Sequence, residues 1–185
     1  MSRLRRMSLA TCVFLVCLVC VFPAFVSGCR PISRSSAAVS ADKANLVKAV
    51  RVDPREGRQW LSLSEYEGDL DGDEAPERVE LLVRADRSPD DGKIVWDDGQ
   101  PWLLLVTDGS DYYPLFDQYV QLGVVYFDVR EDQAGAAEIQ VLLTTGAGFE
   151  LSKISFSAAD RAYKVEQAYA SKGVNLKHTS FPSYR

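Results

Sequence analysis

The chain has 185 residues and an acidic balance, with 21 basic and 26 acidic side chains and a formal net charge of −5. A negative surface disfavours nucleic acid and anionic lipid faces as partners, so we expect no nucleic-acid binding. The length is sufficient for one hydrophobic core.

The N-terminus has the layout of an export signal. Three arginines lie among the first six residues, an apolar run extends from Leu9 to Val26, and the small residues Ser27 and Gly28 follow. This order predicts a signal peptide over residues 1–28. The alternative is an uncleaved transmembrane anchor, because the run is about long enough to cross a bilayer. Pro23 near the end of the run argues against that alternative, as does the lack of a basic cluster after it.

The end of the apolar run, "VSGC", resembles the bacterial lipobox. Val26 takes the apolar position, where leucine is commoner, and Ser27 and Gly28 take the small positions. The resemblance implies cleavage before Cys29, a diacylglycerol on its thiol and usually an acyl chain such as palmitate on its amino group. Several chains give stable anchoring, because each buried methylene contributes about 0.8 kcal/mol. We therefore expect a lipoprotein of the bacterial cell membrane or outer membrane, with its domain outside the cytoplasm.

The cysteines support no other role. Cys12, Cys17 and Cys20 would leave with the leader, and Cys29 would become a thioether. A disulfide framework, a zinc cysteine cluster and a cysteine nucleophile are thereby excluded. The leader holds three basic and no acidic residues, so the mature chain carries 18 basic and 26 acidic residues and a net charge of −8. Such a charge suits a cation or a basic partner, although simple solubility also explains it.

The remaining chain divides into a tether and one domain. Residues 29–45 are rich in Ser and Ala and predict a flexible tether, and residues 46–185 form the globular domain. The segment 41–50, "ADKANLVKAV", predicts one or two helical turns. Segment 84–101 is acidic and rich in turn residues, and predicts an exposed irregular loop. Eight segments show strand patterns between short turns: 60–67, 78–85, 102–108, 112–120, 123–129, 138–145, 149–157 and 163–170.

These strands predict a mainly β fold, an antiparallel meander or sandwich, since no long amphipathic segment separates them. Residues 67–83 align loosely with residues 127–143, which suggests two degenerate repeats over about 60–120 and 121–172. A chance similarity between two acidic turns is the competing explanation.

The first of these turns has the composition of a calcium loop. Asp69, Asp71 and Asp73 occupy alternate positions around Gly72, which permits a tight curl. Such a curl can present several carboxylate oxygens to one ion, and calcium takes six to eight oxygen ligands. "DLDGDEAPE", residues 69–77, resembles the calcium loop of FG-GAP/VCBS repeats, found in propeller blades of the integrin type. The resemblance implies calcium ligands at a set of five positions. They are Asp69, Asp71, Asp73, the carbonyl of Ala75 and Glu77.

Two departures from the family pattern qualify this expectation. Glu74 stands where the family usually has glycine, and Arg130 replaces the middle acid in the second loop, which we do not expect to hold metal. Two repeats are also too few to close a propeller. An ion-free, solvated hairpin is the alternative to a calcium loop.

No residue pattern indicates catalysis. The single histidine, His178, lies near the end of the chain, and no nucleophile elbow, zinc-binding helix or phosphate loop is present. Trp96 is a weak candidate for a recognition residue. We expect a lipid-anchored, non-enzymatic binding or scaffold module of the cell envelope with an unknown protein or glycan partner. The alternative is an envelope hydrolase that acts on glycans through paired carboxylates.

Overall fold

A computed structural model describes residues 45–173 and Tyr184. The predicted signal peptide, the lipobox with Cys29, most of the tether and His178 lie outside the described residues. Within the described part the chain forms strands and turns and no helix, so it contains no helix able to cross a membrane. The prediction of a mainly β, antiparallel fold is confirmed.

The strands follow one another along the chain with short connections. Their bounds are β1 Asn45–Lys48, β2 Leu61–Gly68, β3 Glu77–Val83, β4 Asp86–Arg87, β5 Ile94–Val95, β6 Gly99–Asp108, β7 Asp111–Gln121, β8 Gly123–Glu131, β9 Ala137–Thr145, β10 Gly148–Ser157 and β11 Ala162–Lys172.

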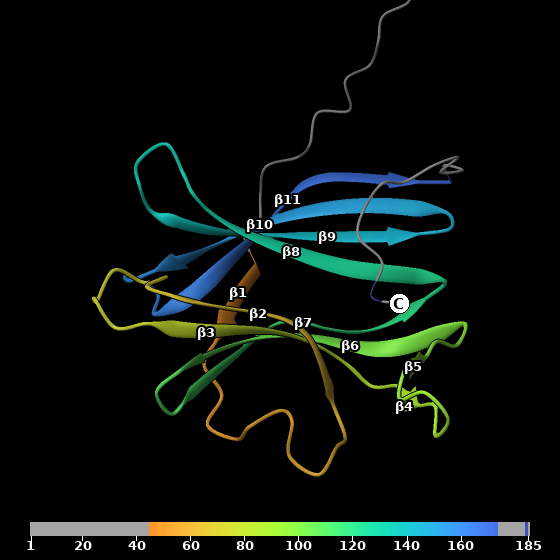
Figure 1. Cartoon of the computed structure of the whole chain (residues 1–185). Coiled ribbons are helices and arrows are strands. Elements are labelled where there is room, and N and C mark those ends of the chain that lie inside the picture. Colours follow the sequence, from red (N-terminus) through yellow and green to blue (C-terminus); the bar gives the residue numbers. More distant parts are fainter. Residues whose placement is uncertain (1–44, 174–183, 185) are drawn as a thin grey trace, which may run out of the picture. The chain divides into compact units, whose positions relative to one another are not determined.

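The strands form two large antiparallel sheets and one small one. The first sheet has the order β2-β3-β6-β7, the second has the order β1-β11-β10-β9-β8, and β4 pairs with β5 as a separate hairpin. Figure 1 shows the two large sheets facing each other as a sandwich. Apart from β1, each sheet is a four-stranded meander of strands in chain order. The two meanders occupy nearly the same ranges that the sequence suggested as repeats.

The core lies between the facing sheets. From β6, the side chains of Trp102, Leu104 and Val106 point into it, and each is fully buried. From the other sheet, Ile139 and Ile154 meet them. The alternation of strand side chains explains why these residues occur at every second position.

Strand β6 is buried on its other face as well. Leu103 and Leu105 point away from the core and pack with Leu82, Trp60 and Tyr112. The connection between β1 and β2 supplies Trp60 and so covers the outside of this sheet. Burial on both faces explains the unbroken apolar run "WLLLV" in β6.

The helix predicted over residues 41–50 is wrong for its described part. Residues Asn45–Lys48 form strand β1, which pairs antiparallel with β11, from Asn45 opposite Val165 to Lys48 opposite Ala162. Helix propensity in so short a segment is a small term, and ladder hydrogen bonds to β11 override it. Just after β1, Val50 bridges to Tyr112 of the other sheet. Residues 45–50 therefore connect the two sheets, through β1 to one and through Val50 to the other.

Segment 84–101 was predicted to be an irregular loop, and this is only partly right. The short strands β4 and β5 form a hairpin within it, with Asp86 opposite Val95 and Arg87 opposite Ile94. Its turn is exposed, as expected. The segment then enters β6 at Gly99.

The chain crosses from the first sheet to the second at Leu122 and Gly123. Leu122 has a φ of 49°, its N–H donates to the carbonyl of Asp98 at 2.6 Å, and its carbonyl accepts from Gly146 N–H at 3.0 Å. A Cβ on Gly123 would lie 2.6 Å from the Thr144 carbonyl oxygen. This close approach requires glycine where the crossing meets β9.

Candidate metal centre

The acidic loop closes the β2–β3 hairpin, which projects to the left in Figure 1. The strand ladder ends with Gly68 opposite Glu77, and residues 69–76 form the turn. Gly72 has a φ of 85° and Glu74 a φ of 70°. Glu74 thus has the left-handed backbone that glycine adopts without strain, and this conformation strains an L-residue.

Aspartate side chains hold the loop in shape through hydrogen bonds to its own backbone. The carboxylate of Asp69 accepts the N–H of Gly72 at 2.7 Å and that of Glu74 at 3.1 Å. Asp71 accepts the N–H of Asp73 at 3.1 Å, and Asp73 accepts that of Ala75 at 2.8 Å. These turns of the Asx type fix where the carboxylates lie relative to one another.

Three of the predicted ligands come together. Carboxylate oxygens of Asp69, Asp71 and Glu77, one from each side chain, lie within 4.8 Å of one another. Asp69 is exposed, Asp71 is half-buried, and Glu77 is only 1% exposed. Oxygens at this spacing surround a space that suits a hard cation.

Glu77 is the residue that sets this cluster apart from an ordinary acidic turn. Its Oε2 accepts the backbone N–H of Leu70 at 2.5 Å. Its Oε1 is buried and has no hydrogen-bond partner among the described residues. An unpaired buried carboxylate oxygen is costly, so a cation or a hydrogen-bond donor at this position would stabilise the fold.

The electrostatics of the cluster agree with this geometry. Burial raises the pKa of Glu77 above its ordinary value, and the nearby carboxylates of Asp71, Asp108 and Asp69 raise it further. Burial likewise raises the pKa of Asp71, with Asp73, Asp108 and Asp69 adding repulsion. A bound cation would favour the ionised form of both carboxylates and so lower their pKa values again.

Asp108 is the contributor that the sequence prediction missed. It ends β6, one residue beyond Thr107, which pairs with Arg78 next to Glu77. The sequence places Asp108 at the end of the predicted strand 102–108, and only the pairing of β3 with β6 brings it near the acidic loop. Asp73, which was predicted as a ligand, lies outside the cluster of three, and Ala75 is exposed in the turn.

The second acidic loop, between β8 and β9, is built differently. Asp132 accepts the N–H of Ala134 at 2.7 Å and that of Ala136 at 2.9 Å. Arg130 pairs with Glu138 at 2.6 Å, and the two residues face each other in the ladder. The glutamate that aligns with Glu77 therefore has a cationic partner already, unlike Glu77.

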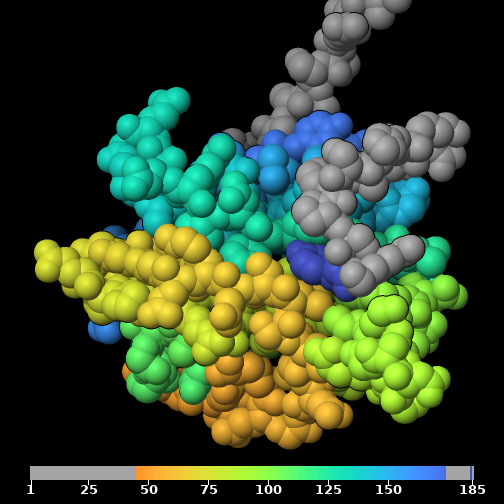
Figure 2. Space-filling view, in the orientation of Figure 1, coloured from red at the N-terminus to blue at the C-terminus, as the bar shows by residue number. Residues whose placement is uncertain are grey.

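The remaining candidate, Trp96, lies at the other end of the sandwich. Its ring stacks on the buried ring of Trp102, with centroids 5.9 Å apart and planes inclined by 20°. It is half-buried, and it borders a hollow beside the β4–β5 hairpin. The lime-coloured surface at the lower right of Figure 2 belongs to this region, and the yellow acidic loop lies at the far left.

Comparison of the chain with protein-family models, with curated proteins and with solved structures finds no match in any of the three.

Proposed function

We propose that this chain is a lipid-anchored, non-enzymatic binding or scaffold module of the bacterial cell envelope, with a β-sandwich stabilised by Ca²⁺. The observation that carries the metal proposal is the buried, unpartnered Oε1 of Glu77 beside the carboxylates of Asp69 and Asp71. The lipobox at Val26 to Cys29 supports the anchor.

The donor set favours calcium over other common ions. All three clustered ligands are carboxylates, and the described residues offer no histidine or cysteine nearby, which disfavours zinc. Asp73 and the carbonyl of Ala75 remain proposed as further ligands, since calcium takes six to eight oxygens in flexible geometry. The proposed calcium ligands are therefore the five that the sequence predicted, with the carboxylates of Asp69, Asp71 and Glu77 at the centre of the site.

The proposed role of the ion is structural. It would link the β2–β3 turn to the buried end of β3 and screen the negative charge that Asp108 adds from β6. At a free concentration one hundred times its Kd, an ion adds about 2.7 kcal/mol of stability. Extracellular calcium is a suitable source for an exported domain, because sites of extracellular modules work at Kd values of about 0.1–1 mM.

A glycan hydrolase is the second candidate, and one observation favours it. Asp86 and Asp97 both line the hollow beside Trp96, so two carboxylates border one space. Both side chains are exposed, whereas a general acid needs burial to raise its pKa. We therefore favour binding without catalysis.

A thermal melt of the mature, detergent-solubilised protein tests the metal. With Ca²⁺ at about 10 mM, one hundred times a Kd of about 0.1 mM, we expect a midpoint about 10 °C higher than with a chelator, because the ion then adds the stabilisation given above. Asp71→Asn should abolish the difference. Asp128→Asn removes the same charge from an exposed side chain that has no hydrogen bond or ion pair among the described residues, and it should keep the full difference. A wild-type midpoint that is the same in Ca²⁺ and in chelator would remove the metal from the proposal.

Mass spectrometry of the mature N-terminus tests the anchor independently. We expect a first residue at Cys29 that carries the mass of a diacylglycerol and an acyl chain. Cys29→Ala should retain the leader and lose the lipid. A native product with an unmodified Cys29 behind an intact leader would refute the anchor.

A further inference from the structure

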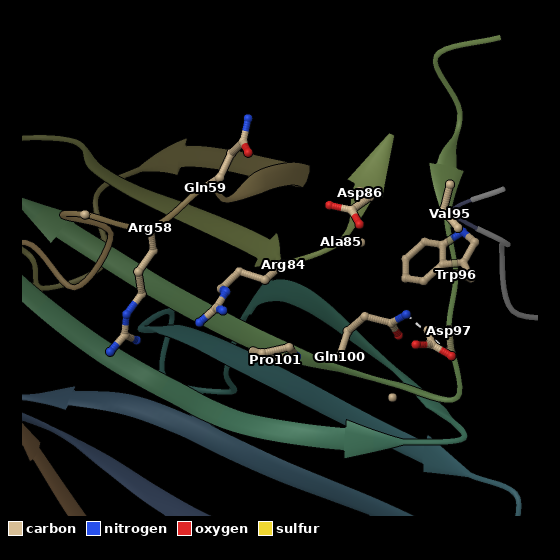
Figure 3. A pocket seen from close by; sticks show the side chains of 12 residues that line it. Arg58, Gln59, Arg84, Ala85, Asp86, Val95, Trp96, Asp97, Gln100 and Pro101 are labelled. Atoms are coloured by element: carbon tan, nitrogen blue, oxygen red, sulfur yellow. Dashed lines mark hydrogen bonds between the residues drawn. The ribbon is translucent and has the colours of Figure 1, made fainter. Parts of the chain in front are cut away.

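A hollow of about 550 Å³ lies at the end of the sandwich opposite the acidic loop. Its walls come from four segments: residues 57–59 before β2, 84–86 from the end of β3 to the start of β4, 95–97 at and after the end of β5, and 99–101 at the start of β6 (Figure 3). Only the tertiary fold brings these segments together. The volume lies within the range of about 300–1,000 Å³ that is usual for small-molecule sites.

Three charged side chains in this hollow have no partner. Arg58, Arg84 and Asp86 are exposed, and none forms a side-chain hydrogen bond or ion pair within the described part of the chain. Four other arginines, Arg51, Arg55, Arg78 and Arg130, each pair with a carboxylate, Arg87 donates to the Gly92 carbonyl, and Arg161 has no ion pair among the described residues. Two unpaired guanidinium groups lining one concave site are therefore unusual in this acidic protein.

The unpaired charges lie at different places in the hollow. Figure 3 shows the side chains of Arg58 and Arg84 running toward the same end of the hollow. Asp86 and Trp96 lie away from that end, and Gln100 reaches toward Asp97. The Gln100 side chain donates to the Asp97 carbonyl at 3.2 Å, which fixes this wall. The site thus offers cations at one end and carboxylates beside an aromatic ring at the other.

From this arrangement we infer that the hollow binds a sugar that carries a carboxylate. A carboxylate suits the planar donor fork of arginine, which Arg58 and Arg84 present without competition. Sugar hydroxyls are donors as well as acceptors, so they suit the exposed carboxylates of Asp86 and Asp97. The apolar C–H face of a sugar ring suits the indole of Trp96.

A simple inorganic anion explains the site less well. It would use the two arginines, but it would leave the carboxylates of Asp86 and Asp97 without donors and the ring of Trp96 without a role. A neutral sugar would leave both guanidinium groups without an anion. A sugar with an acidic group and several hydroxyls would bind the arginines through its carboxylate, the aspartates through its hydroxyls and Trp96 through its ring face.

This inference names the partner of the proposed binding module and so rests on that function, but it does not depend on calcium. The acidic loop and the hollow lie at opposite ends of the sandwich (Figure 2). Failure at one site can therefore be told from failure at the other.

Calorimetric titration of the full mature chain in detergent tests the inference. The probes are an oligomer of glucuronate and the glucose oligomer of the same length and linkage, which differ only by carboxylate against hydroxymethyl. We expect the acidic oligomer to bind at least tenfold more tightly, and we expect its affinity to fall as salt is raised. Equal affinities, or no binding of the acidic oligomer, would overturn the inference.

Variants locate the site. Arg58→Gln and Arg84→Gln should each weaken the acidic oligomer about tenfold while leaving the melting midpoint unchanged, because both side chains are exposed. Arg161→Gln is the control, since Arg161 is an exposed arginine outside the hollow with no ion pair among the described residues, and it should change nothing. Binding that survives both arginine variants would place the sugar elsewhere.

Two further arms separate the remaining explanations. Inorganic phosphate that binds as tightly as the acidic oligomer, with the same loss in Arg84→Gln, would make the hollow a general anion site and overturn the sugar assignment. Asp71→Asn should lose the calcium shift but keep sugar binding. Shortened oligomer after incubation would support the sugar site and overturn the non-enzymatic function in favour of hydrolysis.

Discussion

The ring of Tyr184, the penultimate residue, lies against the buried ring of Trp102, with centroids 6.1 Å apart and planes inclined by 55°. Its other neighbour is Tyr126 of β8, stacked at 5.3 Å. Trp102 belongs to the first sheet and Tyr126 to the second. Tyr184 therefore joins the two sheets at the end of the sandwich that also holds Trp96.

Tyr184→Ala should destabilise the domain by about 2 kcal/mol, because it removes a half-buried aromatic side chain from two ring contacts. Chemical denaturation measures the change. Tyr169→Ala, at a side chain that is 52% exposed, should have a smaller effect. Equal losses for the two variants would show that the contact with Trp102 contributes nothing specific.

Alkaline pH should weaken the fold through the same residue. Burial raises the pKa of Tyr184 to about 12, from an ordinary value of 10. Between these values the unfolded chain loses the phenol proton and the folded chain keeps it, so stability falls as the pH rises from about 10 to 12. Tyr184→Phe should flatten this fall in urea unfolding measured across the range. Tyr113, Tyr126 and Tyr163 also have raised pKa values, so part of the slope should remain.

Glu77→Gln should stabilise the calcium-free domain at pH 7. Burial raises the pKa of Glu77 in the folded state, so the unfolded chain releases that proton first as the pH rises above about 4.5. The ionised carboxylate thus lowers stability above this pH. Glutamine keeps an acceptor for Leu70 N–H and removes the charge. In chelator the variant should melt higher than wild type and lose less stability from pH 4.5 to 7.

The same variant should no longer respond to calcium. In Ca²⁺ the wild type should gain stability and Glu77→Gln should not, because a neutral amide is a weaker ligand for a hard cation. A variant that melts lower than wild type in chelator would contradict the view that Glu77 is a strained, unpaired charge.

Glu74→Gly should stabilise the acidic loop by about 0.5–1 kcal/mol. The left-handed backbone at Glu74, with a φ of 70°, costs an L-residue roughly 1–2 kcal/mol, and part of the gain is lost to the greater freedom of glycine in the unfolded chain. Glu74→Ala removes the charge but keeps the strain, so it separates the two causes. Denaturation midpoints in chelator should rank glycine above alanine; the reverse order would refute the strain.

Gly123→Ala should cost about 1–3 kcal/mol, because the added methyl would lie 2.6 Å from the Thr144 carbonyl oxygen where the chain crosses between the sheets. Gly146→Ala is the matched control. It lies in the neighbouring β9–β10 turn, has nothing within 4 Å of the added atom and does not have a positive φ. Its effect should stay within about 0.5 kcal/mol. Similar losses for both variants would mean that the crossing is not tightly packed.

The local parts of the fold could be predicted from the sequence. Short apolar segments between turns, alternating in β2 and continuous in β6, predicted β2, β3 and β6 to β11, since these patterns are properties of the strand itself. The alternating aspartates marked the loop that brings Asp69 and Asp71 beside Glu77. These features depend on residues close together in the chain, so the chain alone contains them.

Tertiary structure decided what depends on distant segments. The segment that forms β1 has residues of high helix propensity, so the sequence predicted a helix there. Its strand partner β11 lies more than a hundred residues away, and nothing near Asn45 indicates that pairing. Asp108 raises the pKa of Glu77 only because β6 lies beside β3. Arg58 and Arg84 meet in one hollow only because the sheets place their segments side by side. A local pattern fixes the direction of a side chain, but packing alone fixes its neighbours.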